Sequence, residues 1–263
     1  MAEETRDETG HTPGGIFYRV DGEAGRPFLI FSNSLGTNLR MWDLQAEVFS
    51  EHFQVVRYDT RGHGRSTAPL GPYSLAQLGG DVIELLDHLD VKQAHFCGIS
   101  MGGAIGQWLG VHAEERIARL AIANTAARIG TAEGWQARAA AVRESGLGGL
   151  AASAPQRWFT AAFAERAPIV VSALVDAMGG GNAEGYAACC DALAAADQRD
   201  DVRRIALPTL VIAGEEDPVT TVEDARFLYE RIPGARLSVL PASHISNIEA
   251  ASAFNQALSS FLQ

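Results

Sequence analysis

The stretch "FCGISMGG", Phe96 to Gly103, holds one serine, Ser100, with a glycine two positions before it and another two positions after it. The residues that lead to it, Ala94 to Ser100, predict a buried strand, and Met101 to about His112 predict a helix. A serine between a strand and a helix occupies a tight turn with strained backbone angles, and the glycines remove side chains that would collide there. Its hydroxyl then stands at the end of the strand, facing the positive end of the helix. We therefore interpret Ser100 as a nucleophile.

Outward from this turn, short apolar runs alternate with helical stretches along most of the chain. This alternation is typical of an α/β fold with a mostly parallel, twisted sheet flanked by helices. We expect strands at residues 16–22, 28–34, 53–59, 94–100, 119–125, 208–214 and 235–241, and helices at 39–51, 75–89, 101–112 and 247–262.

The alternation stops between Thr125 and Asp201, where the chain is alanine-rich and shows no convincing strand. We expect residues 127–200 to form an all-helical lid inserted between two strands of the sheet, called the helical insertion below. The core domain is then residues 1–126 and 201–263. A lid in this place would cover the carboxyl edge of the sheet, where ligands bind in open α/β sheets.

The composition excludes several classes of partner. The net charge of −11 disfavours nucleic acid and anionic membrane surfaces, and no apolar run approaches the roughly 18 residues of a membrane span. The N-terminal segment "MAEETRDETGHTPGG" is acidic and polar, unlike a signal peptide, and we expect it to be unstructured. Three cysteines, Cys97, Cys189 and Cys190, have no metal-ligand spacing and predict buried free thiols, no metal site and a cytoplasmic location.

A serine nucleophile needs a base to take its proton. Of the seven histidines, His244 follows the last expected strand, where a loop can lean over the carboxyl edge of the sheet. His63 lies in a loop at the same edge, and we expect it to stabilise that turn instead. His244 is therefore the predicted base.

The base needs an acid to orient it. Asp217 lies three residues beyond the strand that ends at Gly214, far enough along the loop to reach an imidazole. Glu215 and Glu216 are alternatives that lie closer to the strand end, where solvent exposure is the default. We predict a triad of Ser100, Asp217 and His244.

The oxyanion formed by serine attack needs hydrogen-bond donors. The backbone N–H of Met101, directly after the nucleophile, is one predicted donor. The second is expected from the loop "NSLG" that follows the strand at 28–34, from the N–H of Leu35.

These features together resemble the α/β-hydrolase superfamily over essentially the whole chain. The segments "FSNSLGTNLRMWD", "RYDTRGHGRS", "FCGISMGGAIGQWLG", "IANTAARIGTAEGWQAR", "GYAACCDAL" and "ASHISNIE" are similar to the 3-oxoadipate enol-lactonases. The resemblance implies hydrolysis of an unsaturated lactone with an acetate arm, through a serine acyl-enzyme and without a cofactor. It places the enzyme in the β-ketoadipate pathway of aromatic-compound catabolism.

An acidic protein needs a local cation to hold an acidic lactone. Arg138 lies three residues after Trp135, a spacing that puts both side chains on one helix face. The family's lid carries the same pairing, which implies that Arg138 binds the carboxylate while Trp135 and Trp158 contact the ring. We expect the other arginines of the helical insertion to be solvated; these are Arg128, Arg143, Arg157 and Arg166.

The same triad on this fold also serves other reactions. An esterase, a different lactonase, a cofactor-free perhydrolase or a carbon–carbon bond hydrolase would keep all three residues. A ligand receptor or a cofactor-free cyclase on the same scaffold is disfavoured, because every part of the hydrolytic machinery is present.

Overall fold

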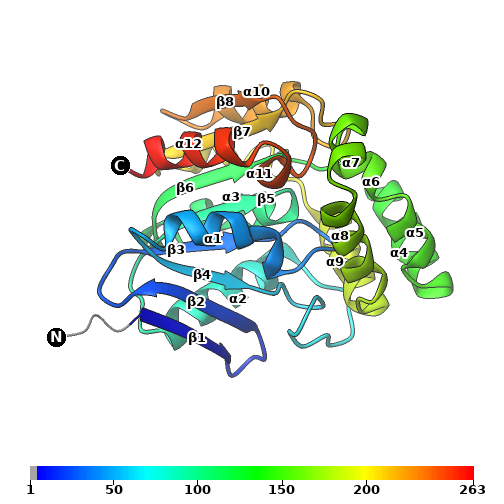
Figure 1. Ribbon diagram of the computed structural model, residues 1–263, viewed down its shortest axis with the longest axis horizontal. Coiled ribbons are helices and arrows are strands. Elements are labelled where there is room, and N and C mark those ends of the chain that lie inside the picture. Colours follow the sequence, from blue (N-terminus) through cyan, green and yellow to red (C-terminus); the bar gives the residue numbers. More distant parts are fainter. Residues whose placement is uncertain (1–4) are drawn as a thin grey trace.

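Eight strands form one sheet in the computed structural model, which describes residues 5–263 (Figure 1). They are β1 (Thr5–His11), β2 (Phe17–Glu23), β3 (Phe28–Ser32), β4 (Gln54–Tyr58), β5 (Ala94–Ile99), β6 (Ile117–Ala123), β7 (Thr209–Gly214) and β8 (Arg236–Leu240). Their order in the sheet is β1-β2-β4-β3-β5-β6-β7-β8. The strands from β4 to β8 in this order pair in parallel, and only β1 and β2 run antiparallel to their neighbours. The expected α/β fold with a mostly parallel sheet is confirmed.

Helices cover both faces of the sheet. On one face α1 (Asp43–Phe49) packs against α12 (Ala251–Leu262), and the other face carries α2 (Leu75–His88), α3 (Met101–His112) and α10 (Val222–Arg231). The central strands β3, β5, β6 and β7 are mostly apolar because both faces of the sheet are covered there. Shorter helices are η1 (Leu39–Trp42), η2 (Glu114–Arg116), η3 (Val202–Arg204) and α11 (Ser246–Glu249). None of the helices in residues 5–263 combines the length and apolar character that a membrane crossing needs.

The N-terminal segment differs from the sequence prediction. Thr5–His11 are not unstructured but form β1, which pairs antiparallel with β2 from Thr5↔Glu23 to His11↔Phe17. A strand at the edge of a sheet gains its order from backbone hydrogen bonds to one neighbour, so it needs no apolar run, and charged residues there discourage pairing with other chains. Residues 1–4 lie outside the described part of the chain.

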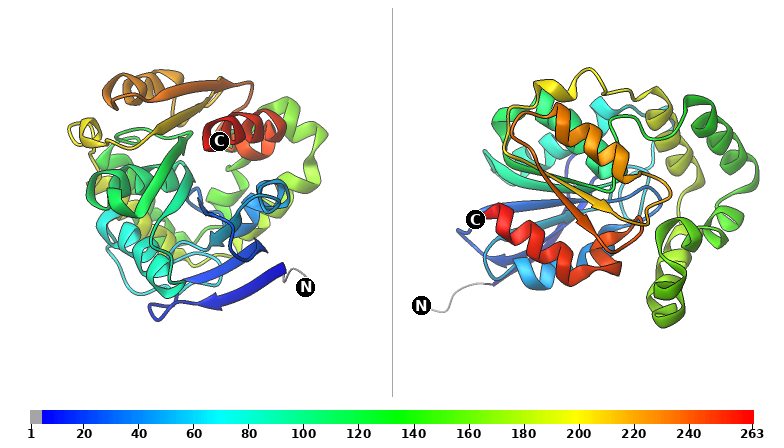
Figure 2. Two further views of the ribbon diagram at one scale, coloured as in Figure 1. Left: turned by 90° about the vertical axis from the view of Figure 1, so that its left-hand side faces the viewer. Right: turned by 90° about the horizontal axis from the view of Figure 1, so that it is seen from above.

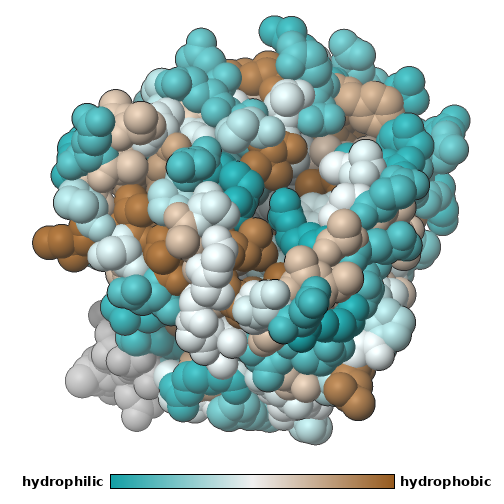
Figure 3. All heavy atoms as spheres, turned by 90° about the vertical axis from the view of Figure 1, so that its right-hand side faces the viewer, coloured by the Kyte–Doolittle hydropathy of each residue, from teal (hydrophilic) through white to brown (hydrophobic). Residues whose placement is uncertain are grey.

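The helical insertion contains six helices between β6 and β7. They are α4 (Ala132–Ser145), α5 (Gly148–Ala152), α6 (Pro155–Trp158), α7 (Ala161–Arg166), α8 (Pro168–Gly179) and α9 (Ala183–Ala195). They stand at one end of the sheet and not over either face, as both Figure 1 and the right-hand view of Figure 2 show. Figure 3 views this side of the molecule, where hydrophilic residues surround a recess in which hydrophobic residues are visible.

The last helix of the insertion meets the core at one point by direct backbone contact. Gly185 of α9 lies so close to Gly62, in the loop after β4, that a Cβ on Gly62 would be 2.6 Å from the Cα of Gly185. A Cβ on Gly185 would likewise collide with the backbone of Gly62. Only glycine at both positions permits this contact.

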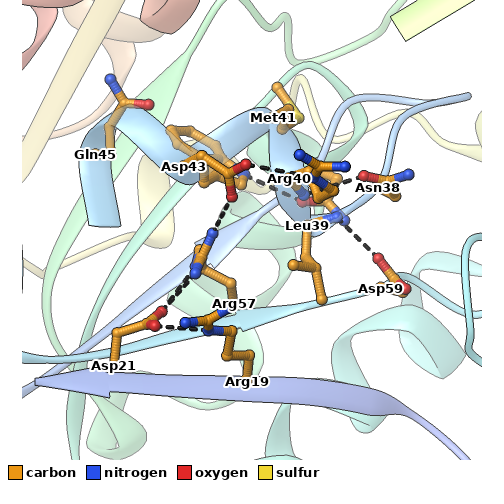
Figure 4. A network of polar contacts seen from close by, with 12 residues as sticks. Arg19, Asp21, Asn38, Leu39, Arg40, Met41, Asp43, Gln45, Arg57 and Asp59 are labelled. Carbon is orange, nitrogen blue, oxygen red and sulfur yellow. Dashed lines mark hydrogen bonds and ion pairs between the residues drawn. The ribbon is translucent and has the colours of Figure 1, made fainter. Parts of the chain in front are cut away.

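A buried arginine ties the antiparallel part of the sheet to α1 (Figure 4). The Arg57 guanidinium, on β4, donates to Asp21 Oδ2 of β2 at 2.6 Å and to Asp43 Oδ1 of α1 at 2.5 Å. Below α1, the carboxylate of Asp59 accepts hydrogen bonds from the backbone N–H groups of Leu39 and Arg65, each at 2.8 Å. These contacts hold the start of α1 and the loop before it against the end of β4.

Candidate active site

Ser100 sits between β5 and α3 with a backbone conformation, φ 57° and ψ −114°, that residues other than glycine rarely adopt. Its N–H donates to the carbonyl of Ala123 at 2.9 Å, and the Thr125 hydroxyl donates to its carbonyl at 2.8 Å. A Cβ on Gly98 would collide with the carbonyl oxygen of Gly102. The strained turn therefore depends on absent side chains around it and on hydrogen bonds from β6.

Asp217 and His244 are joined by a hydrogen bond of 2.8 Å between Oδ2 and Nδ1. Asp217 lies in the loop after β7 and His244 in the loop after β8, so neighbouring parallel strands deliver them to the same edge of the sheet. Both side chains are buried. With Nδ1 donating to the carboxylate, Nε2 is the nitrogen left to accept a proton.

Both oxygens of the Asp217 carboxylate accept further hydrogen bonds. Oδ1 accepts from the N–H groups of Val219 at 2.8 Å and Thr220 at 3.0 Å, while Oδ2 accepts from the Thr220 hydroxyl at 2.8 Å and from Asn124 Nδ2 at 3.0 Å. Burial acts to raise the pKa of Asp217, but the His244 imidazole and these hydrogen bonds outweigh it and hold the pKa below its usual value. The group is thus an ionised carboxylate that orients the imidazole.

Ser100 and His244 both face one cavity of about 300 Å³. No hydrogen bond joins the serine hydroxyl to the imidazole within the described chain; the two groups share the cavity wall. Glu215 and Glu216, the alternatives considered from sequence, are exposed, and within the described chain neither forms a hydrogen bond or ion pair with His244.

The loop after β3 borders this cavity through Ser34 and Leu35. The N–H of Ser34 points at the sulfur of Met41 (3.4 Å), that of Gly36 donates to His63 Nε2 (3.0 Å) and that of Thr37 to the carbonyl of Ser34 (3.2 Å). No acceptor is found for the N–H of Leu35 in residues 5–263, and Leu35 lines the cavity. Met101, as the first residue of α3, likewise has no intrahelical acceptor.

His63 supports the loop after β3. Because its Nε2 accepts from Gly36, the ring proton lies on Nδ1, which donates to the carbonyl of Arg61 at 3.3 Å. Burial lowers the pKa of His63 to about 4, against the opposing effect of the hydrogen bond to Arg61. His63 therefore stabilises the loop after β3, because its ring binds the N–H of Gly36, the residue that follows Leu35.

Asn33 fixes the same loop from the other side. Its side chain donates to the carbonyl of Tyr58 at 2.7 Å and accepts from the indole N–H of Trp42 at 3.1 Å, while its carbonyl accepts from the N–H of Gly102. The loop after β3 and the turn at Ser100 are thereby held together. The sequence prediction used this loop only as the source of the Leu35 N–H and missed the role of Asn33.

The helical insertion supplies the outer wall of the cavity. Trp135, Arg138 and Trp158, the predicted substrate contacts, all line it. The Arg138 guanidinium lies over the Trp135 ring, 4.6 Å from its centroid, and the Trp135 indole N–H donates to the carbonyl of Ile129 at 2.5 Å. Trp135 is thus a platform that orients Arg138.

A second arginine was missed by the sequence prediction. Arg157, expected to be solvated, is half-buried and lines the cavity with Arg138. Burial, together with the charge of Arg138, lowers the pKa of Arg157. Neither arginine has a carboxylate partner within 4.0 Å among residues 5–263, whereas Arg143 on the outer side of α4 pairs with Glu184 and Asp191. The cavity therefore presents two uncompensated positive charges, which suits an anion.

The full lining of the cavity also includes Ser34, Ile129, Gly130, Thr131, Gly134, Met178, Tyr186, Pro218 and Val219. The side chains of Met178 and Tyr186 come from α8 and α9, whose sequences carry no signal that they face a ligand. In the described residues no group of histidine, cysteine and carboxylate side chains could hold a metal ion, and Cys97, Cys189 and Cys190 are buried free thiols.

The chain is similar to known hydrolases over most of its length. Residues 27–251 match the family model described as alpha/beta hydrolase fold. The chain is 56% identical to 3-oxoadipate enol-lactonase 2 of Acinetobacter baylyi, over 94% of this chain and 92% of that protein, and 42% identical to 3-oxoadipate enol-lactonase 1 of the same organism, over 93% and 92%. The crystal structure of the enol-lactonase from Burkholderia xenovorans LB400 superimposes with a TM-score of 0.94 at 46% identity, covering 97% of this chain and 99% of that one.

Proposed function

Because the chain belongs to the α/β-hydrolase family and, within it, to the 3-oxoadipate enol-lactonases, we propose that it hydrolyses 3-oxoadipate enol-lactone to 3-oxoadipate. The membership makes it a carboxylic ester hydrolase. The observation that carries the proposed substrate is the cavity itself: it joins Ser100 and His244 to two arginines without acidic partners. A lactone with a carboxylate arm needs both parts of this site: a nucleophile and base for the lactone carbonyl, and a cation for the carboxylate.

In the first step Ser100 Oγ attacks the lactone carbonyl while His244 Nε2 takes the hydroxyl proton. Asp217 keeps the imidazole in the tautomer that can accept it and stabilises the imidazolium that forms. The N–H groups of Met101 and Leu35 would receive the oxyanion, since neither has an acceptor in the part of the chain that the structure describes. Each donor of this kind is worth a factor of roughly 10²–10³ in rate.

Collapse of the tetrahedral intermediate breaks the ring C–O bond. The departing enol oxygen takes the proton from His244, and the enol then becomes a ketone, which makes ring opening hard to reverse. Water attacks the Ser100 ester in the second half, again giving up its proton to His244, and the released serine takes that proton back. No step needs a group beyond these residues and water.

The helical insertion acts in this proposal as a lid domain, residues 127–200, on a core of residues 1–126 and 201–263. Its contribution is to bind the substrate: Arg138 pairs with the carboxylate arm, and Trp135 and Trp158 shape the space around the ring. The partner is thus a small anionic lactone. We also propose a cytoplasmic location, because the three cysteines are unpaired.

The test is to supply purified protein with muconolactone and its isomerase and to follow the loss of enol-lactone absorbance. We expect rapid loss with the wild type and only the isomerase background with Ser100→Ala. Labelling of Ser100 by a fluorophosphonate without any turnover of the enol-lactone would overturn the proposed substrate and leave a hydrolase of another ester.

A further inference from the structure

A buried carboxylate lies outside the proposed triad but next to it. Glu249, at the end of α11, is 9% exposed and has no cationic partner within 4.0 Å in the described chain. Its charge is compensated by hydrogen bonds alone. Oε2 accepts from the N–H of Ser243 at 2.9 Å, and Oε1 accepts from the N–H of Thr160 at 3.2 Å and from the Thr160 hydroxyl. A buried charge without such donors would be strongly unfavourable.

The two partners of Glu249 belong to separate parts of the molecule. Ser243 precedes His244 directly in the loop after β8, whereas Thr160 lies in the helical insertion, between α6 and α7. Thr160 also caps α7, since its hydroxyl accepts from the N–H of Phe163 at 3.2 Å. One carboxylate therefore bridges the loop of the proposed base and the insertion.

A second contact joins the same two segments on the other side of His244. The N–H of Ile245 donates to the carbonyl of Trp158 at 3.0 Å. The backbone on both sides of His244 is thus tied to the short segment Trp158–Thr160, at Ser243 through Glu249 and at Ile245 directly. Trp158 itself lines the cavity, so the segment that forms part of the binding wall also holds the base.

We propose that Glu249 is a positioning residue that locks the His244 loop to the segment Trp158–Thr160 of the helical insertion, so that the alignment of the base with Ser100 depends on that segment. This inference rests on the proposed role of His244 as base. Glu249 itself does not touch the reacting atoms; it acts through the peptide group of Ser243.

The partners explain why the residue is a glutamate. Ser243 and Thr160 both present backbone N–H groups, which require an acceptor, and an ionised carboxylate is an acceptor at both oxygens. Glutamine has the same shape, but its NH₂ group would face one of these N–H donors. Glu249→Gln therefore breaks one side of the bridge with the smallest change in volume.

The experiment compares Glu249→Gln with Glu165→Gln, a matched change of an exposed glutamate on α7. We measure kcat and KM for the enol-lactone and, separately, the rate at which a fluorophosphonate modifies Ser100, all well below the melting temperature of each variant. Glu249→Gln should lower kcat and the modification rate roughly 10–100-fold, the usual effect of a small misplacement of a catalytic group, with little change in KM. Glu165→Gln should match the wild type.

Variants of Thr160 test the bridge from its other end and do not depend on the folding of Glu249→Gln. Thr160→Val removes the hydroxyl and should slow Ser100 modification like Glu249→Gln, whereas Thr160→Ser keeps the hydroxyl and should restore it. The double variant Glu249→Gln/Thr160→Val should be no slower than the worse single one, because both changes break the same link.

Unchanged rates in both Glu249→Gln and Thr160→Val, or losses that multiply in the double variant, would overturn the proposal. A slow Glu249→Gln beside a normal Thr160→Val would show that the Thr160 hydroxyl contributes nothing to the position of the histidine loop, which also overturns the proposed link. If the wild type is modified by the fluorophosphonate but does not open the enol-lactone, the proposed substrate fails while the modification rates still decide the role of Glu249.

Discussion

At the scale of single residues, Asn124 does more than occupy the end of β6. Its Nδ2 donates to Asp217 Oδ2 at 3.0 Å and to the carbonyl of Ser243 at 3.1 Å, and its Oδ1 accepts from the Ser246 hydroxyl at 2.5 Å. One amide thus connects the loop of the acid with the loop of the histidine. Its backbone adopts φ 44°, a left-handed conformation that asparagine tolerates better than most residues.

The acid of the triad can be tested by substitution. Asp217→Asn keeps the shape of the carboxylate but removes its charge and presents a donor to His244, so kcat should fall by up to about 10⁴-fold. Ser100→Ala should cost more, about 10⁶-fold, because it removes the nucleophile. Glu215→Gln and Glu216→Gln, in the same loop but exposed, are the controls for steady-state assays. A larger loss in either control than in Asp217→Asn would move the acid to that position.

Recognition of the substrate carboxylate by Arg138 can also be tested at the level of single residues. Arg138→Ala should raise KM for the enol-lactone roughly 10–100-fold, the value of one charge-assisted hydrogen bond pair, and leave KM for an uncharged aryl acetate unchanged. Arg143→Ala, on the same helix but paired with Glu184 and Asp191, is the matched control. Equal losses on both substrates would mean that Arg138 only supports the insertion.

Arg157 should behave differently, because it is also built into the insertion. It donates to the carbonyls of Ser153 and Leu150 and to the Ser153 hydroxyl, at 3.0–3.2 Å. Arg157→Ala should therefore raise KM for the anionic lactone and lower the melting temperature together, which paired kinetic and calorimetric measurements would show. A raised KM with an unchanged melting temperature would contradict the structural half of this role.

At the scale of elements, the strands and helices of the core were predictable where apolar periodicity is strong, as in β3, β5 and α2. The missed elements are β1, a polar strand at the sheet edge, and α10, a short helix that begins with a capping box at Thr221 and Asp224. The expected closing helix at 247–262 is two helices, α11 and α12, separated at Ala250. Periodicity reports burial, and these features depend on pairing and capping instead.

The residues of the candidate site likewise fall into those that the sequence predicted and those that it missed. Ser100, Asp217 and His244 each follow a strand of the parallel sheet, so their shared edge could be deduced from the sequence. Glu249 bonds a residue 89 positions away, and Arg157 faces the cavity only because of how α6 is placed. Such contacts are set by tertiary packing between distant segments, for which a single sequence gives no spacing rule.

The close approach of α3 to β3 at Gly102 can be tested by substitution. A Cβ on Gly102 would collide with the carbonyl oxygen of Ser32 in β3, which is backbone and cannot move aside. Gly102→Ala should lower the free energy of unfolding by about 1–3 kcal/mol and displace Ser100, with a loss of kcat. Gly149→Ala, on α5 with no atom near the added methyl group, should be neutral or slightly stabilising. Urea unfolding and steady-state kinetics measure both; an equally stable and active Gly102→Ala would refute the close approach.

At the scale of the whole molecule, the charge of the surface and the charge of the cavity have opposite signs. The chain carries a net charge of −11, whereas the cavity holds two arginines, Arg138 and Arg157, for which residues 5–263 supply no carboxylate within 4.0 Å. Charges on the surface are screened within about 8 Å at physiological salt, so the arginines dominate once the substrate has entered. The acidic exterior and an acidic substrate are therefore compatible.

Global stability should depend on pH through His63. Its pKa falls from the usual 6.5 to about 4 on folding, so the unfolded chain binds the proton more tightly than the folded one. This contribution is fully present above pH 6.5 and is lost as the pH falls from 6.5 toward 4, by up to about 3 kcal/mol in all. Urea unfolding at pH 7 and pH 4.5 should show a smaller loss for His63→Gln than for the wild type. An identical pH dependence in the two proteins would contradict the buried neutral imidazole.

The backbone contact between Gly62 and Gly185 bears on how substrate gets in. It fastens α9 to the core at one side of the cavity, while the bonds around Thr160 and Ile245 fasten the insertion at the other. Swinging the insertion away as a rigid body would have to break both attachments at once. We therefore expect entry and exit by rotation of side chains at the cavity mouth, on picosecond to nanosecond timescales, instead of the microsecond to millisecond hinge motion of a domain. Turnover in this enzyme would accordingly not be limited by lid opening.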